Sequence, residues 1–464
     1  MIMLSLKMTG KIPFKEVFFH GMVRDSDGRK MSKSLGNVVE PVDFIEGISL
    51  EDLNAKLKTG NLDPNEYERA TKWQRTAFPN GIPECGTDAL RFWATSNTAA
   101  TTAADINLDV NLLHAFRKFS NKIFQATKYV MSKLPENFVP AASAVVTGKT
   151  LAERWILHKM NLAAQEINEN LEKREFAKAS QAAYRYWYRY VMHRVVADQD
   201  FLVFRVRANA QRDVTTSHLC DVYIENSKSI IQDGTEEERT SATQTLYTAL
   251  DAALRLIHPF MPFISEELWQ RLPRRPEEKA KSIMVADFPQ FHDALNDPTS
   301  EAAYERVIGC SSGSRSLMAE YGLKEQVKII LQAHDDDALQ TLKTEQASIK
   351  TLCGKGVDQV EILKPGEPRP SGCVTFPVSS SLAVYLYVKG RVDIEAEIDK
   401  AAKRLSKIQS ALEKQKKAVS DPTYLEKVSL TVQNADRKRI AELESEASAF
   451  EGTIQQFERL KLEA

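Results

Sequence analysis

The chain has 464 residues, of which 43% are hydrophobic and 27% are charged, and its formal net charge is −1. This composition excludes a disordered chain, and the length suffices for several domains with sizeable cores. Because the net charge is close to zero, any nucleic-acid-binding surface must be local rather than spread over the whole protein.

The five cysteines lie far apart and form no C-x-x-C pair, which argues against a protein-bound metal and favours a reducing compartment. No apolar run is long enough to span a bilayer, and Lys7 interrupts the apolar N-terminal stretch with no cleavage site after it. We therefore expect a cytoplasmic protein, and a mitochondrial form of the same gene is the alternative.

The first predicted element is a buried strand over residues 14–23, FKEVFFHGMV, which is rich in aromatic and β-branched residues. The stretch RDSDG breaks this strand, and a loop with the sequence KMSKS follows it. Pro41 suits the first turn of a short helix. Residues 51–85 read as polar and irregular, and a helix begins near residue 86 with Thr87 or Asp88 as its cap.

Residues 111–295 are predicted to form a helix bundle, because apolar residues recur there at steps of three and four. Pro259 and Pro262 should break the last long segment into two helices. Residues around 189–218 depart from the pattern, and we interpret them as an insertion into the bundle. Two origins are open for this insertion: it is either a translated retained intron or a lineage-specific loop.

The C-terminal part changes character twice. Residues 296–390 contain short strands with a helix between the first two, which predicts a small α/β module. Residues 391–464 carry two heptad-patterned segments joined by the proline-bearing turn SDPTY, which predicts an antiparallel coiled-coil hairpin. We expect this hairpin to close on itself and leave a monomer; a scaffold that pairs through its heptads is an alternative.

The KMSKS loop has features that suit a polyanion. Lys30 and Lys33 stand three residues apart among two hydroxyls and backbone N–H groups, and such a loop can close over phosphates. No G-x-x-x-x-G-K-[ST] is present, so it is not a P-loop. Taken alone, a solvated basic turn or a phosphorylation target explains the pattern equally well.

The context of the loop resembles a known family. RKMSKSLGNVVEPVDFIEGISL (29–50) closely resembles the second signature of class I aminoacyl-tRNA synthetases. IPECGTDALRF (82–92) and DINLD (105–109) resemble the valine-specific members, particularly their eukaryotic form. HPFMPFISEELWQRLP (258–273) resembles the last helices of the anticodon-binding domain of those members, and the resemblance covers most of residues 5–464.

The resemblance implies a fold that is mainly α and multidomain. Residues 1–110 would be the end of a Rossmann-like α/β catalytic domain with the KMSKS loop and a stem-contact region, and residues 111–295 a helical anticodon-binding domain. Residues 296–390 would be a connecting α/β module, and residues 391–464 a coiled-coil arm that binds tRNA.

In this family the loop closes over ATP, supplied with Mg²⁺, while the amino acid carboxylate attacks the α-phosphorus and pyrophosphate leaves. The resemblance implies catalytic roles for Lys30 and Lys33. It implies ATP binding by Lys30, Met31, Ser32, Lys33 and Ser34. The ligands expected of the complete enzyme are ATP, valine and tRNA(Val).

The chain departs from the family in one respect that bears on activity. Class I enzymes need an H-x-G-H signature before the loop, but none of the eight histidines begins one, and only 29 residues precede Lys30. We therefore expect the C-terminal half of a longer synthetase, without that signature and without an editing domain. The alternative is a catalytically inactive fragment that only holds tRNA.

Two basic segments are candidates for tRNA contact. Residues 110–135 carry five basic side chains and no acidic one, and residues 400–417 carry seven basic and one acidic. The candidate residues are Arg117, Lys118, Lys122, Lys403, Arg404 and Lys407. An ordinary solvated face is the alternative for each segment. Trp155, Trp187 and Trp269 could stack on bases, but their helical spacing favours core packing.

Overall fold

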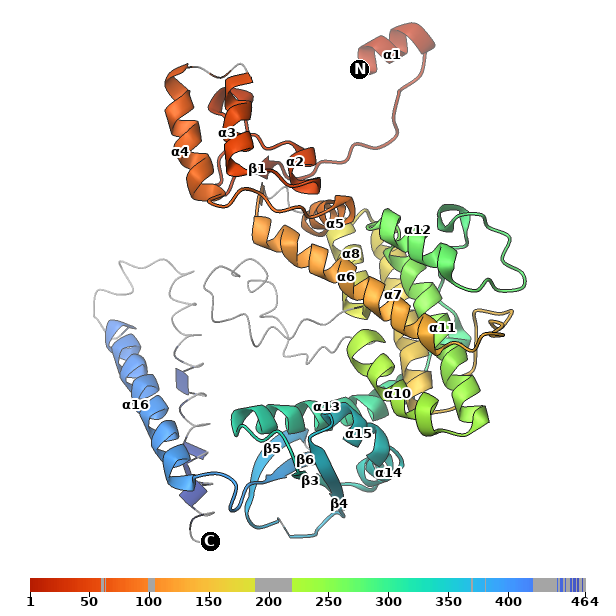
Figure 1. The fold of residues 1–464 in the computed structure, drawn as a ribbon, viewed down its shortest axis with the longest axis vertical. Helices are drawn as coiled ribbons and strands as arrows, with labels where there is room; N and C mark the ends of the chain where they lie inside the picture. The colour runs from red at the N-terminus through yellow and green to blue at the C-terminus, as the bar shows by residue number, and fades with distance from the viewer. Residues whose placement is uncertain are drawn as a thin grey trace. The chain divides into compact units, whose positions relative to one another are not determined.

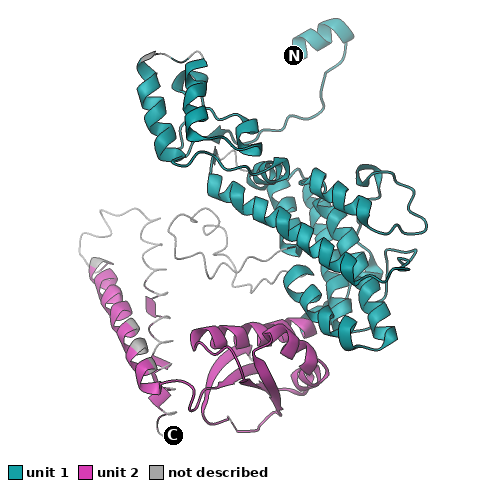
Figure 2. Cartoon of the chain, in the orientation of Figure 1, with its two compact units in different colours: residues 1–302 teal, residues 303–464 magenta. Residues whose placement is uncertain are grey.

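The computed structural model describes residues 1–59, 62, 64–98, 105–187, 219–368, 370–379 and 381–419, and scattered positions from 440 to 461. The chain divides into two compact units, residues 1–302 and 303–464, which Figure 2 colours separately. The predicted insertion at about 189–218 lies outside the described residues. Within the described part, no helix is both long enough and apolar enough to cross a membrane.

The first part of unit 1 carries short helices and a two-stranded parallel sheet (Figure 1). Its elements are α1 (Ile2–Thr9), β1 (Val23–Arg24), the 3-10 turn η1 (Lys33–Leu35), α2 (Pro41–Ile45), α3 (Leu50–Thr59), the 3-10 turn η2 (Pro64–Glu66), α4 (Tyr67–Ala77), α5 (Thr87–Asn97) and β2 (Ile106–Asn107). The prediction that residues 51–85 are irregular was wrong, since α3 and α4 lie there. Each of these two helices buries only two residues, too few for a period to show in the sequence.

The predicted buried strand over residues 14–23 was also wrong. Only Val23 enters a strand, and the side chains of Val17 and Phe19 are 61% and 75% exposed. A strand needs paired neighbours and covered faces, and among the described residues only the two-residue strand β2 pairs with this segment.

The rest of unit 1 is a helix bundle, as predicted. Its elements are α6 (Val110–Lys133), α7 (Leu151–Glu172), α8 (Phe176–Trp187), the π-helical turn η4 (Leu219–Tyr223), α10 (Ile224–Asp233), α11 (Glu236–Ile257), α12 (Pro262–Arg271), the 3-10 turns η5 (Ile283–Val285) and η6 (Asp293–Leu295), and the start of α13 (Pro298–Glu320). Capping boxes fix where α7 and α11 begin, through Thr150 with Glu153 and Thr235 with Glu238. All three tryptophans considered for base stacking are buried, which confirms the core interpretation.

Helix α12 is capped from a distant part of the chain. The break between α11 and α12 falls at Pro259 and Pro262, as predicted, but the predicted cap of α5 was wrong, because no side chain caps that helix. The Asp88 carboxylate instead accepts hydrogen bonds from the N–H groups of Phe263 at 3.2 Å and Ile264 at 2.7 Å, in the first turn of α12. Asp88 therefore stabilises a helix that begins far from it in sequence.

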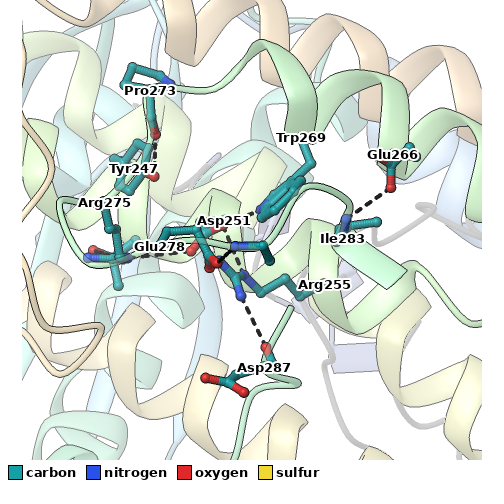
Figure 3. A network of polar contacts seen from close by, with 12 residues as sticks. Tyr247, Asp251, Arg255, Glu266, Trp269, Pro273, Arg275, Glu278, Ile283 and Asp287 are labelled. Carbon is teal, nitrogen blue, oxygen red and sulfur yellow. Dashed lines mark hydrogen bonds and ion pairs between the residues drawn. The ribbon is translucent and has the colours of Figure 1, made fainter. Parts of the chain in front are cut away.

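A buried charge network fastens the segment after α12 to the bundle (Figure 3). Asp251 on α11 accepts hydrogen bonds from Arg255 at 3.1 Å and from the indole N–H of Trp269 at 2.9 Å. Arg255 also donates to Glu278 at 2.7 Å and to the carbonyl of Asp287 at 3.1 Å. Because Glu278 and Asp287 both follow α12, Arg255 holds this irregular segment against α11.

Unit 2 contains a four-stranded mixed sheet in the order β4-β3-β6-β5. Its elements after α13 are β3 (Val327–Ala333), α14 (Asp336–Thr344), α15 (Gln346–Cys353), β4 (Val357–Leu363), β5 (Cys373–Ser379) and β6 (Leu382–Tyr387). The strands occupy the predicted segments, and two helices replace the single one predicted between β3 and β4. Two glycines let α13 lie close to β5, since a Cβ on Gly309 would sit 2.4 Å from Val378 and one on Gly313 would sit 2.6 Å from Phe376.

Helix α16 (Ile394–Val419) forms the first arm of the predicted hairpin. Described positions of the second arm contact it in antiparallel order, since Lys416 pairs with Glu444 and Lys461 pairs with Glu395, each at 2.6 Å. The connecting turn and most of the second arm lie outside the described residues. The coiled-coil hairpin therefore stays a prediction.

Candidate functional site

The candidate site is the KMSKS loop, and a tight turn after β1 sets it in place. The N–H of Asp25 donates to the Arg29 carbonyl at 3.0 Å, and the N–H of Gly28 donates to the Asp25 carbonyl at 3.0 Å. Lys30 then pairs with Arg24 in an antiparallel bridge. The loop therefore leaves directly from the side of strand β1.

Within the loop, Ser32 organises the backbone. Its hydroxyl accepts the N–H of Ser34 at 3.2 Å and lies 2.6 Å from the Ser34 hydroxyl, at the start of η1. Lys30, Lys33 and Ser34 are exposed, whereas Met31 and Ser32 are half-buried. Both lysine side chains are therefore open to a ligand, while the residues between them belong to the base of the loop.

Two buried residues outside KMSKS hold this base. Asn37 is 2% exposed and donates from Nδ2 to Oδ2 of the fully buried Asp25 at 2.9 Å. Asp25 also accepts the backbone N–H of Arg29 at 2.8 Å, the Nε–H of Arg29 at 3.0 Å and the N–H of Asp27 at 3.1 Å. Burial alone would raise the pKa of Asp25, but the bonds from Asn37, Arg29 and Asp27 outweigh burial and hold the pKa below its usual value.

Helices α3 and α4 support the far end of the loop. Gly36 has φ +64°, and a Cβ there would lie 2.8 Å from the Ala70 Cβ and 3.1 Å from the Leu57 Cδ2, so only glycine fits. The guanidinium carbon of Arg29 lies 5.8 Å from the ring centroid of Trp73 on α4. The loop is thus packed on one side and open on the side of its lysines.

The arrangement offers two cations and two hydroxyls, a set that binds phosphate oxygens. In the part of the chain that the structure describes, no group of three or more His, Cys, Asp or Glu side chains could hold a metal ion.

The basic residues predicted on α6 divide into two kinds. Arg117 pairs with Glu84 at 2.7 Å and Lys122 with Asp221 at 2.6 Å, so carboxylates from other segments already neutralise these two. Lys118 is exposed. It is therefore better placed than the other two to contact a nucleic acid.

On α16, the side chains of Lys403 and Lys407 are exposed, while that of Arg404 lies outside the described residues.

Asp25 and Asn37 were not predicted as functional residues, because in the sequence they stand only within the RDSDG turn and within the signature over residues 29–50. A signal was present, because Asp and Asn beside glycine-containing turns commonly bond nearby backbone groups. The pairing of these two residues across the loop is visible only once the turn is folded.

Two family models match separate parts of the chain. Residues 1–109 match the family described as tRNA synthetases class I (I, L, M and V), and residues 194–333 match the anticodon-binding domain of tRNA ligase. The chain therefore belongs to the class I aminoacyl-tRNA synthetases.

Within that class the chain belongs with the valine–tRNA ligases. It is 42% identical over 463 residues to the mitochondrial valine–tRNA ligase of Saccharomyces cerevisiae, an alignment that covers 100% of this chain and 39% of that protein. It is 46% identical over 356 residues to the valine–tRNA ligase of Schizosaccharomyces pombe, covering 76% and 33%. It is 36% identical over 463 residues to that of Homo sapiens, covering 99% and 34%.

The chain thus spans about a third to two fifths of the length of these relatives. Among solved structures, the Agrobacterium radiobacter K84 agnB2 LeuRS–tRNA–LeuAMS ternary complex aligns with a TM-score of 0.37 and 15% identity, over 79% of this chain and 35% of that one. That likeness is too low to support an argument.

Proposed function

We propose that this chain takes part in the ATP-dependent attachment of valine to tRNA(Val) through a valyl-adenylate. The observation that carries the proposal is the KMSKS loop, with both lysines open to a ligand, in a chain homologous to valine–tRNA ligases over its whole length. Because the chain spans less than half of those relatives, the remainder of the active site would lie on sequence that corresponds to the rest of their length.

In the proposed reaction the loop acts on ATP, which brings Mg²⁺ as part of the substrate complex. Attack by the valine carboxylate on the α-phosphorus moves negative charge onto the departing pyrophosphate. Lys30 and Lys33 would neutralise that charge, and the hydroxyls of Ser32 and Ser34 would donate hydrogen bonds to phosphate oxygens. Removing Lys33 would then slow adenylate formation more than it weakens ATP binding.

For tRNA, we propose that the bundle binds the anticodon region and that the basic faces of α6 and α16 contact phosphates. The exposed Lys118, Lys403 and Lys407 support this assignment, since phosphate contacts come from basic side chains that are free to approach the backbone. We propose a monomer that works in the cytoplasm, as expected from the sequence.

A second candidate function is a fragment that holds tRNA without catalysing valine activation. The observation that favours it is the lack of an H-x-G-H signature anywhere in the sequence, since these histidines line the ATP site in class I enzymes.

One pair of assays tests both candidates on the chain itself. We expect salt-dependent binding of tRNA(Val), measured by filter binding or fluorescence anisotropy, and no detectable valine-dependent pyrophosphate exchange. Failure to bind tRNA(Val) would refute both candidates. Measurable exchange by residues 1–464 would instead exclude the non-catalytic fragment.

A further inference from the structure

The side chain of Asn37 makes three hydrogen bonds at the base of the loop. Its Oδ1 accepts the N–H of Ser32 at 2.9 Å, and its Nδ2 donates to the carbonyl of Lys30 at 3.2 Å and to Asp25 Oδ2 at 2.9 Å. Lys30 and Ser32 flank Met31. One amide therefore fixes the main chain that runs between the two lysines.

Asp25 in turn anchors the amide. Its carboxylate is fully buried and already accepts two bonds from backbone N–H groups of the preceding turn and one from the side chain of Arg29, so the turn sets its position. The Asp25–Asn37 bond thus connects a rigid turn to a loop whose other side is open.

The pair lies among charges from several segments. Arg29 contacts Asp25 and also pairs with Asp27, and Glu66 and Arg69 line a small pocket together with Asn37. Arg24, the neighbour of Asp25 in sequence, pairs with Asp105, and Lys30 contacts Asn37 through its carbonyl. Arg29 lies closest, with its Nε 3.0 Å from Asp25.

Only an amide satisfies all three partners at position 37. A carboxylate could accept from Ser32, but it could not donate to Lys30 or Asp25 and would place a second negative charge beside a buried one. An apolar side chain would leave the Asp25 oxygen and the Ser32 N–H without this partner.

We propose that Asn37 and Asp25 are positioning residues for adenylate formation. Their hydrogen bond fixes the main chain between Lys30 and Lys33 so that both ammonium groups meet the phosphates of ATP together. This inference rests on the proposed function, and it assigns to the two residues a role that the loop motif itself does not include.

The first test is amide hydrogen exchange of the loop in the full chain, read by mass spectrometry. Asn37→Ala should lower the protection of the amides at residues 32–36 by about tenfold to a hundredfold, the effect of losing a hydrogen bond to a charged group. Peptides from α7 and α11 should exchange as in the unaltered chain. Unchanged loop protection in Asn37→Ala would overturn the proposal.

A second variant makes the test independent of folding defects. In Asn37→Asp, two carboxyl groups share one site, so both are ionised only at high pH. Loop protection, corrected for intrinsic exchange, should be low at about pH 8. It should recover at about pH 5, because a protonated carboxyl can again donate across the pair.

The unaltered chain should show no such change, and neither should Asn121→Asp, which alters an exposed asparagine on α6. If the amide protection of the loop in Asn37→Asp does not change with pH, the proposal is overturned.

A last experiment tests whether the position of the loop affects the binding of ATP. Because the rest of the ATP site would lie outside this chain, the experiment uses a chimera in which residues 1–464 replace the matching part of the S. cerevisiae mitochondrial valine–tRNA ligase. Acylation of Lys30 and Lys33 by an amine-reactive ester is measured in this chimera with and without ATP and Mg²⁺. In the chimera with the unaltered sequence ATP should protect both lysines, and the same chimera with Asn37→Ala should need about tenfold more ATP for the same protection.

If ATP protects neither lysine, the ATP assignment of the proposed function and the positioning role both fail, even where exchange shows an ordered loop. If ATP protects both lysines equally well in Asn37→Ala, the proposed function stands and the positioning role alone is overturned.

Discussion

Replacing Arg255 with methionine should lower the free energy of unfolding of the helix bundle by about 3 kcal/mol, the lower part of the range for breaking a buried ion pair. The variant keeps most of the apolar stem but removes the cation shared by Asp251 and Glu278, whose side chains are 6% and 15% exposed. Arg275 remains 3.5 Å from the second oxygen of Asp251, which limits the loss.

The assay is urea unfolding followed by tryptophan fluorescence. All five tryptophans lie within residues 1–302, so the signal reports unit 1 alone. The matched control is Arg271→Met, which breaks an ion pair with Glu267 in which both side chains are 62% exposed, and it should cost less than about 0.5 kcal/mol. Equal shifts for the two variants would refute the reasoning, because the buried network would then contribute no more than a surface pair.

Three further outcomes are expected. Deleting residues 189–218 should raise the free energy of unfolding of unit 1 by about 1–3 kcal/mol, since a shorter connection between α8 and α10 loses less entropy on closure; a lowered melting temperature would count against this. Changing Lys403, Arg404 and Lys407 to alanine should weaken binding of every tRNA alike and make the slope of log affinity against log salt shallower by about two to three. An unchanged slope would show that the hairpin is not the phosphate-binding arm. Burial lowers the pKa of His258 below its usual value of 6.5, so the folded state favours the neutral ring and stability should fall as pH drops through 6.5 toward the folded pKa. His258→Gln should flatten this dependence in urea titrations, and an equally steep loss in the variant would assign it to other groups.

The long helices of the bundle could be predicted because each buries a continuous stripe that repeats in the sequence. The strands of unit 2 could be predicted because the β-branched and aromatic residues of β3 and β6 are almost all buried. Helices α3 and α4 bury too few residues to produce a period. The stretch at 14–23 has strand-like composition, but composition does not supply the neighbouring strands that a sheet requires.

The site could be predicted only as far as its motif reaches. The loop residues could be identified from KMSKS itself. The hydrogen bonds beneath the loop could not, because they depend on the contact between Asp25 and Asn37, which are 12 residues apart in the sequence. The tRNA candidates show the same limit. In the sequence, Arg117 and Lys122 have no acidic residue near them. In the fold, Arg117 pairs with Glu84, 33 residues away, and Lys122 pairs with Asp221, 99 residues away.

The most direct test of the central claim is a chimera in which residues 1–464 replace the matching part of the S. cerevisiae mitochondrial valine–tRNA ligase, to which they are 42% identical. We expect the chimera to charge tRNA(Val) with valine. Lys33→Ala in the same chimera should slow valine-dependent pyrophosphate exchange about a hundredfold, or ~3 kcal/mol in the transition state. A folded chimera that binds tRNA(Val) but activates no valine, or that exchanges pyrophosphate equally fast after Lys33→Ala, would contradict the account.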